Sequence, residues 1–252
     1  MVTLMGDADY GRIGVGYARH RRTDPRIAAL VHAALGDART VVNVGAGAGS
    51  YEPSDRHVLP IEPSPEMRRQ RPSHLAPAIH GIAEALPFDD DAVDAAMAMV
   101  TVHQWPDPVA GLREMRRVAR GPVLVLTFDP AELGRLWLMD YAPELQQLDA
   151  GRCPSIETIT AALGQSSEVR PVPIPIDCVD GFIEAFYARP ESLLDPAVRR
   201  AQSTWSLLAP GVEERAVQAL AADLASGAWD ERYGSHRTQP EFEGAVRLVI
   251  SH

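Results

Sequence analysis

Short apolar runs alternate with segments of helical periodicity between residues 27 and 129 of the 252-residue chain. Apolar runs rich in β-branched residues are typical of strands that are buried on both faces, as in a parallel sheet covered by helices. The pattern predicts strands over 40–45, 57–63, 77–83, 92–100 and 121–130. Helices are expected over 26–36, 64–71 and 108–120. This part of the chain is therefore predicted to be an α/β unit.

Beyond residue 130 the pattern becomes mainly helical, and most of the aromatic residues are found there. Helices are expected over 157–164, 181–190, 196–209 and 212–227. The proline-rich stretch 169–177 is predicted to be extended, because each proline disfavours the α conformation at the residue before it. Its alternating apolar residues favour an edge strand of the same sheet over a linker between domains. Residues 245–251 are predicted to form the last strand.

Charge and composition narrow the possible functions. The chain carries 34 acidic and 24 basic residues, for a net charge of −10. Nucleic acid is not expected as a partner, because its backbone is bound by clustered cations and repelled by a net acidic surface. All the basic residues are arginines and none is lysine. Chemistry that needs a side-chain amine, such as Schiff-base formation, is therefore excluded.

Cysteine and histidine usage argues against disulfides and metals. Cys153 and Cys178 are too few for a disulfide framework or a zinc site, and the eight histidines occur singly, without the close pairs that bind metals. No apolar run approaches the ~20 residues that cross a bilayer, and the first residues lack the pattern of a signal peptide. We therefore predict no metal, no membrane contact and a cytoplasmic location.

The stretch VVNVGAGAGSYEP at 41–53 carries the strongest chemical signal. A strand that runs into Gly45, Gly47 and Gly49 lets the backbone approach a ligand where a Cβ atom would collide. Glu62 ends the next predicted strand, where a carboxylate can accept hydrogen bonds from both hydroxyls of a ribose. The combination predicts a nucleoside site, against the alternative of a purely structural turn.

The spacing of the glycines indicates which nucleoside is bound. A dinucleotide fingerprint reads GxGxxG, whereas this loop reads GxGxG and has Ser50 where the third glycine should stand. A GxGxG turn with an acidic residue one strand later resembles motif I and its acidic partner in class I S-adenosylmethionine-dependent methyltransferases.

The resemblance continues along the chain. The segment GIAEALPFDDDAVDAAMAMVTVHQW at 81–105 resembles the family's fourth strand and the residues around it. The segment LREMRRVARGPVLVLTF at 112–128 resembles the helix and strand that follow. The chain is most similar to the type 11, or ubiquinone-biosynthesis-like, small-molecule methyltransferases, many of which belong to bacterial secondary metabolism.

This resemblance implies a single Rossmann-like α/β domain over residues 1–252. Its sheet would have seven strands, mostly parallel with an antiparallel last strand, and helices on both faces. The parts would be an N-terminal lid at 1–25, a cofactor-binding core at 26–130, helices and a strand at 131–176, a helical cap inserted late at 177–244, and the last strand at 245–252.

The resemblance also implies S-adenosylmethionine as the cofactor. Glu62 would hold the ribose hydroxyls, and Met99 and Val100 would lie beneath the sulfonium. Two lid residues, Tyr17 and Arg21, would shield the sulfonium and pair with the cofactor carboxylate, unless they belong only to a solvated basic face. The methionine portion would lie over Gly45, Ala46 and Gly47, and the adenine would contact Pro63, Ser64, Met67, Ile82, Ala83 and Glu84, with the N–H of Ala83 as a donor.

Three positions depart from the family pattern. Asn43 stands where the motif usually has an acidic residue, so a negative charge near the cofactor ammonium is lost and weaker binding is expected. Ile82 stands where an aspartate often contacts the adenine amino group, and Gln104 stands where many relatives have a second histidine.

His103 is the candidate catalytic residue, because it follows the fourth strand of the resemblance and its ordinary pKa of about 6.5 suits proton removal at neutral pH. Orientation of the substrate is the alternative role. Trp105, Phe128 and Trp137 are expected to contact the substrate, because their segments follow the carboxyl ends of strands.

The expected function is methyl transfer to oxygen, nitrogen or carbon of a small, largely apolar molecule, by a monomer or homodimer. One alternative is an enzyme of this fold that uses bound S-adenosylmethionine for cyclisation or rearrangement without methylation. A non-catalytic nucleoside-binding module is another, since a fold does not determine a reaction.

Overall fold

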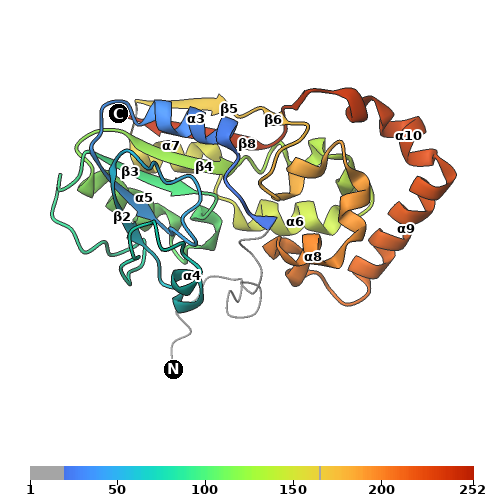
Figure 1. Cartoon of the computed structure of the whole chain (residues 1–252), viewed down its shortest axis with the longest axis horizontal. Coiled ribbons are helices and arrows are strands. Elements are labelled where there is room, and N and C mark those ends of the chain that lie inside the picture. The colour runs from blue at the N-terminus through green and yellow to red at the C-terminus, as the bar shows by residue number, and fades with distance from the viewer. Residues whose placement is uncertain (1–19, 165) are drawn as a thin grey trace.

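The computed structural model describes residues 20–164 and 166–252. Within these residues the main sheet has six strands, in the order β2, β1, β3, β4, β8, β5. Their bounds are β1 Thr40–Val44, β2 His57–Ile61, β3 Ala95–Met99, β4 Val123–Phe128, β5 Ser167–Pro171 and β8 Val246–Ser251. β8 is antiparallel to both of its neighbours, whereas β1 to β4 pair in parallel. The Rossmann-like α/β fold with an antiparallel last strand is confirmed (Figure 1).

The expected strand at 77–83 is wrong, which leaves six strands in the described sheet rather than seven. Ile79 forms an isolated parallel bridge with Ile61, and no longer pairing follows. Pro77 has no N–H to donate to a ladder, and the chain turns back at Ile82.

Three helices around the sheet begin with a capping residue followed by proline. α3 Pro25–Ala34 follows Asp24, α4 Pro65–Arg69 follows Ser64, and α5 Pro108–Val118 follows Asp107. Each capping side chain accepts a hydrogen bond from a backbone N–H of its helix. Proline suits the first helical position because its missing N–H would have no partner there.

The chain after β4 is mainly helical. Its α-helices are α6 Pro143–Arg152, α7 Ile156–Leu163, α8 Pro196–Arg200, α9 Val212–Ser226 and α10 Ala228–Tyr233. Short 3₁₀ helices join them: η2 Leu133–Arg135, η3 Trp137–Asp140, η4 Ile183–Phe186, η5 Pro190–Leu194, η6 Ser203–Leu207 and η7 Gly234–Thr238. A separate pair of short strands joins β6 Ile174–Pro175 to β7 Glu241–Phe242.

Several of these elements differ from the expected ones. The helix expected at 181–190 is the short η4, and the helix expected at 196–209 divides into α8 and η6. α6 and α10 were not predicted. α6 fully buries only Leu145, so no apolar stripe marks it, and α10 follows α9 directly at Gly227, whose φ of 84° ends one helix before the next begins. β5 lies at the sheet edge, as the pattern at 169–177 predicts.

Helices cover both faces of the sheet. On one face α5 and α7 bury Leu112 and Ile159. On the other face α3 buries Ile27, in an apolar cluster that continues into the C-terminal helices and includes Trp137 and Trp229. Figure 1 shows the sheet at one end of the molecule and α6, α8, α9 and α10 gathered at the other.

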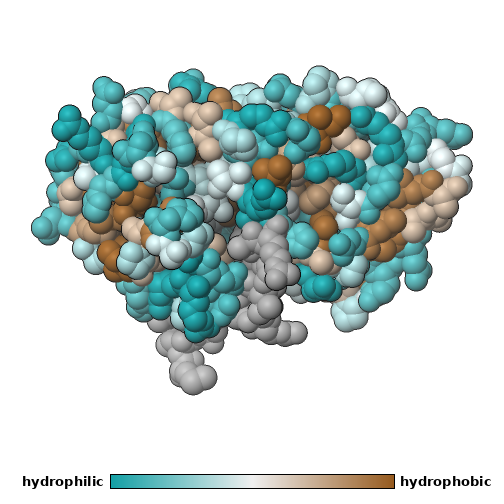
Figure 2. Space-filling model, viewed as in Figure 1, coloured by the Kyte–Doolittle hydropathy of each residue, from teal (hydrophilic) through white to brown (hydrophobic). Residues whose placement is uncertain are grey.

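The face of the molecule shown in Figure 2 is mostly polar. On the face shown in Figure 2, apolar residues are scattered in small groups among hydrophilic ones. None of the helices in the described residues has the length and apolar character needed to cross a membrane.

Candidate functional site

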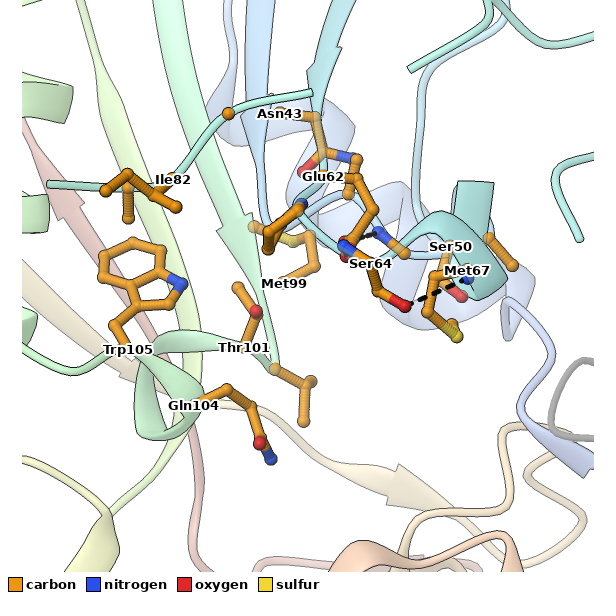
Figure 3. Close-up of a pocket in the computed structure, with 18 of the residues that line it drawn as sticks. Asn43, Ser50, Glu62, Ser64, Met67, Ile82, Met99, Thr101, Gln104 and Trp105 are labelled. Carbon is orange, nitrogen blue, oxygen red and sulfur yellow. Dashed lines mark hydrogen bonds between the residues drawn. The ribbon is translucent and has the colours of Figure 1, made fainter. Parts of the chain in front are cut away.

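A cavity of about 300 Å³ lies at the carboxyl ends of β1, β2 and β3, the edge at which open α/β sheets bind ligands (Figure 3). Tyr17 lies outside the described residues. The other residues predicted to bind the cofactor all line the cavity: Arg21, Asn43, Gly45, Ala46, Gly47, Glu62, Pro63, Ser64, Met67, Ile82, Ala83, Glu84, Met99 and Val100. Among the described residues the wall also includes Ala48, Ser50, Tyr51, Gly81, Thr101, Gln104, Trp105 and Pro106.

The glycine turn after β1 is shaped largely by packing within the protein. All three glycines have positive φ angles, of 69°, 52° and 98° in chain order. A Cβ atom on Gly45 would lie 2.3 Å from Thr101 Oγ1, and one on Gly49 would lie 2.3 Å from Leu75 Cδ1. At Gly47 the nearest atom would be 3.4 Å away. Contacts with Thr101 and Leu75 therefore exclude a side chain at positions 45 and 49, whereas at 47 the positive φ angle alone favours glycine.

Glu62 is held at the end of β2 by backbone groups. Its Oε2 accepts the N–H of Gly47 at 2.8 Å, and its Oε1 accepts the N–H of Ser64 at 2.8 Å. Burial raises its pKa above the usual value, and these two hydrogen bonds oppose the rise. Each carboxylate oxygen keeps acceptor capacity after these bonds, so the group can accept from two ribose hydroxyls.

Trp105 and Ile82 lie near each other at one end of the cavity (Figure 3). Gly111 of α5 makes room for the indole, because a Cβ there would lie 2.6 Å from Trp105 Cε3 and 2.9 Å from the Cβ of Ala83. Trp105 therefore lies beside the residues assigned to the adenine, although it was predicted to contact the substrate. The Glu84 carboxylate accepts the N–H of Asp107 at 3.0 Å and so fixes the start of α5.

A buried network behind the glycine turn was missed by the sequence reasoning. The side-chain amide of Asn43 donates to Glu52 Oε1 at 2.9 Å, and Glu52 Oε2 accepts from Arg71 at 2.8 Å. The Glu52 and Arg71 side chains are 1% and 3% exposed. Glu52 lies within the glycine-rich stretch at 41–53. No sequence pattern distinguishes Arg71 from the arginines near it.

A second buried network joins the loop to the cap. Asp180 accepts from Arg21 Nε and from the Tyr51 hydroxyl, both at 2.7 Å. Tyr51 has a φ of 63°, which is uncommon for a residue other than glycine, and its N–H donates to Thr23 at 2.9 Å. Burial and the Asp180 carboxylate raise the pKa of the Tyr51 hydroxyl. These partners are far apart in the sequence, so no local pattern predicts that they meet.

The chain turns sharply after β3. Val100, at the cavity wall, has a φ of 54°, which is strained for a β-branched residue. His103 lies in the next element, η1 Val102–Gln104, and is half-buried. Burial, together with the positive charges of Arg152 and Arg21, lowers its pKa to about 3. Its neighbours Thr101 and Gln104 line the cavity, but His103 does not.

Phe128 and Trp137 do not line the cavity, so the geometry does not support the substrate contacts expected of them. Phe128 packs edge-on against Phe182, with 6.0 Å between ring centroids. Trp137 is buried, and its indole N–H donates to the carbonyl of Tyr187 at 2.8 Å. An aromatic residue that follows a strand end can face the cap core as readily as the site.

The residues present fit S-adenosylmethionine. The Glu62 carboxylate suits the ribose, and Gly47 leaves one side of the turn open. Asn43 Oδ1 is buried in the cavity wall and has no hydrogen-bond partner among the described residues, as suits an acceptor for the cofactor ammonium. Nowhere in the described ranges do three His, Cys, Asp or Glu side chains gather closely enough to hold a metal ion.

Comparisons with known sequences identify a methyltransferase domain in the chain. Residues 42–125 match the family described as "Methyltransferase domain". An uncharacterized methyltransferase of Mycobacterium tuberculosis is 35% identical over 91 residues, which cover 33% of this chain and 36% of that protein. The chloroplastic 2-methyl-6-phytyl-1,4-hydroquinone methyltransferase of Spinacia oleracea is 31% identical over 112 residues, 40% of this chain and 33% of that protein. The matches thus span about a third of these relatives.

The structural comparison extends over nearly the whole chain. The crystal structure of a proposed methyltransferase from an antibiotic biosynthesis pathway of Anabaena variabilis has a TM-score of 0.85 and 28% sequence identity. The alignment covers 93% of this chain and 100% of that one. Residues 42–125 therefore form a methyltransferase domain of the class I S-adenosylmethionine-dependent type 11 family, and the chain is similar over nearly its whole length to that methyltransferase structure.

Proposed function

We propose that this chain transfers a methyl group from S-adenosylmethionine to oxygen, nitrogen or carbon of a small, largely apolar molecule. The observation that carries the proposal is the cavity at the ends of β1, β2 and β3, in which Glu62, Gly47 and Asn43 are arranged as a nucleoside and an amino-acid group require. A volume of about 300 Å³ is at the lower end for small-molecule sites.

The chain's residues would act mainly by binding and orientation. Bound S-adenosylmethionine supplies an electrophilic methyl group, so the protein has to place the acceptor atom in line with it and exclude water. Glu62 would hold the ribose and Asn43 Oδ1 the ammonium. Val100 and Thr101, where β3 ends, would border the space between cofactor and acceptor.

We assign His103 an orienting role rather than that of a base. A group whose pKa is near 3 is neutral at physiological pH but is too weakly basic to compete for a proton. The two arginines that depress its pKa also disfavour the positive charge that a base would acquire. Because its neighbours Thr101 and Gln104 line the cavity and His103 does not, the orienting role would act through the η1 turn that presents those two side chains.

An apolar acceptor and a place in bacterial secondary metabolism are supported by the relatives. The Anabaena protein comes from an antibiotic biosynthesis pathway, and the spinach enzyme methylates a phytyl hydroquinone. In this chain, Val100, Met99 and Pro106 give the cavity wall an apolar character. The proposal includes a cytoplasmic location and a monomer or homodimer.

The test is turnover with S-adenosylmethionine that carries a labelled methyl group, in the presence of a panel of apolar phenols, hydroquinones and amines. We expect S-adenosylhomocysteine and a labelled product to form together, in equal amounts, with at least one acceptor class. A converted substrate without S-adenosylhomocysteine would instead establish the cyclisation alternative. Cofactor binding without conversion of any panel member would contradict the apolar substrate class.

A further inference from the structure

The buried side chains of Asn43, Glu52 and Arg71 form a chain of hydrogen bonds that ends at the cavity. Asn43 is 1% exposed and lies near the end of β1, between β2 and β3. Its Nδ2 donates to Glu52 at 2.9 Å, and Glu52 pairs with Arg71 at 2.8 Å. Asn43 belongs to the set of residues that the family resemblance assigns to the cofactor, whereas Glu52 and Arg71 lie outside that set.

These contacts fix which way the Asn43 amide faces. An amide has one donor end and one acceptor end, and a carboxylate can only accept. Because Glu52 Oε1 takes the donor end, Oδ1 is held as the end that lacks a partner among the described residues, in a residue that lines the cavity. A rotated amide would place two oxygen atoms against each other, which is unfavourable in a buried site.

Arg71 extends the network to the glycine turn. Its Nη1 donates to the carbonyl of Gly47 at 3.3 Å, and its Nε and Nη2 donate to the carbonyl of Ala76 at 3.0 and 2.9 Å. A Cβ on Gly49 would lie 3.3 Å from Arg71 Nη1 and 3.4 Å from Glu52 Oε2, so the ion pair lies directly against the turn.

We propose that Glu52 and Arg71 are positioning residues that hold Asn43 Oδ1 toward the ammonium group of S-adenosylmethionine. The carboxylate that relatives carry at position 43 is thus replaced by a neutral oxygen acceptor, and the nearby negative charge of Glu52 is balanced by Arg71. This inference rests on the proposed use of the cavity for S-adenosylmethionine.

Asn43→Asp tests the proposal, because the family pattern alone predicts tighter binding when the acid is restored. Here the new carboxylate would face Glu52 at hydrogen-bond distance. Two adjacent carboxylates share a proton at low pH because the pKa of one of them is raised, so affinity is measured at mildly alkaline pH, where loss of that proton makes them repel each other. We expect S-adenosylhomocysteine to bind at least tenfold more weakly. Unchanged or tighter binding would overturn the proposal.

Combining Asn43→Asp with Glu52→Gln should restore the affinity for S-adenosylhomocysteine. The glutamine amide can donate to the carboxylate introduced at position 43, which restores one carboxylate, one amide and one guanidinium to the network. We expect this double variant to recover most of the affinity that the single variant loses. Failure to recover any affinity in a folded double variant would overturn the proposal. Glu66→Gln, which removes a carboxylate from an ion pair on α4, is the matched control and should bind as the wild type does.

A second ligand separates positioning from general damage to the loop. 5′-Methylthioadenosine lacks the amino-acid portion, so Asn43→Asp should change its affinity less than threefold. Equal weakening of both ligands would overturn the positioning role while leaving the proposed function intact. Failure of the folded wild type to bind S-adenosylhomocysteine would overturn both.

Discussion

The two sides of the cavity are built in different ways. The cofactor side comes from one stretch of chain, residues 43–106, and uses strand ends, backbone N–H groups and the Glu62 carboxylate. The opposite side depends on contacts between distant segments: Arg21 and Tyr51 meet Asp180 across 159 and 129 residues. The first side is therefore set by local chain geometry, and the second is set by how the cap packs.

Recognition of the cofactor is expected on the first of these two sides. A shared cofactor needs the same few contacts in every family member, and local motifs provide them. In the described part of the chain no residue beyond Pro106 lines the cavity, and the cap acts on it through Asp180, which holds Arg21 and Tyr51. Changes on the two sides should therefore have separable effects on stability and on cofactor affinity.

Asp180→Asn changes the cap side of the cavity and should have the largest effect on stability. The Asp180 side chain is 2% exposed and its partner Arg21 is 12% exposed, so the substitution removes a carboxylate that neutralises a poorly solvated guanidinium. We expect the free energy of unfolding to fall by about 3 kcal/mol in chemical denaturation. Asp177→Asn, which removes an exposed partner of Arg26, should cost less than about 1 kcal/mol. Equal losses would show that Asp180 does not hold the two segments together.

Glu62→Ala changes the cofactor side of the cavity. It removes the acceptor for two ribose hydroxyls, each worth about 1.5 to 3 kcal/mol when the acceptor is charged. We therefore expect affinity for S-adenosylhomocysteine to fall at least ~100-fold in calorimetric titration. Glu66→Ala on the same side of the sheet should change it little. A loss of less than tenfold in Glu62→Ala would remove Glu62 from the ribose site.

Glu184 makes the stability of the junction between the cap and β8 depend on pH. It lies in η4 at the start of the cap, accepts the N–H of Ala245 at 2.7 Å just before β8, and has its pKa raised by burial to about 7. Because the folded state holds the proton more tightly than the unfolded state, stability is present at low pH and is lost as pH rises toward and through 7. The loss from pH 5 to pH 8 due to this residue should be about 2 to 3 kcal/mol.

Denaturation of wild type and Glu184→Gln at pH 5 and pH 8 measures this contribution. The variant has no group to ionise, so its stability should decline less over the same range by about that amount. Parallel pH dependence in the two proteins would show that Glu184 does not control the junction between the cap and β8.

Gly111→Ala should have the smallest effect and concerns the adenine end alone. Alanine in a helix interior normally stabilises by up to about 1 kcal/mol relative to glycine. At this position the new Cβ would displace the Trp105 indole, so affinity for adenosine and for S-adenosylhomocysteine should fall about fivefold together. Gly151→Ala in α6 has nothing within 4 Å and should leave both affinities unchanged.

The sequence allowed prediction of the parts whose contacts are local. The glycine turn and Glu62 are fifteen residues apart and share one hydrogen bond, so a motif describes them. Glu52 and Arg71 escaped prediction because burial of an ion pair has no composition signal. Trp137 was misplaced because nothing in its own segment says that Tyr187 would accept its N–H. Contacts made by folding of distant segments, such as that of Asp180, lie beyond any local pattern.

Calorimetric titration of the folded wild-type chain with S-adenosylhomocysteine tests whether the cavity binds this cofactor, and it needs no knowledge of the substrate. We predict saturable binding of one ligand per chain. The same titration should show that Glu62→Ala has lost that binding while remaining folded. Absence of binding by folded wild-type protein at millimolar ligand would contradict the assignment of the cavity to this cofactor.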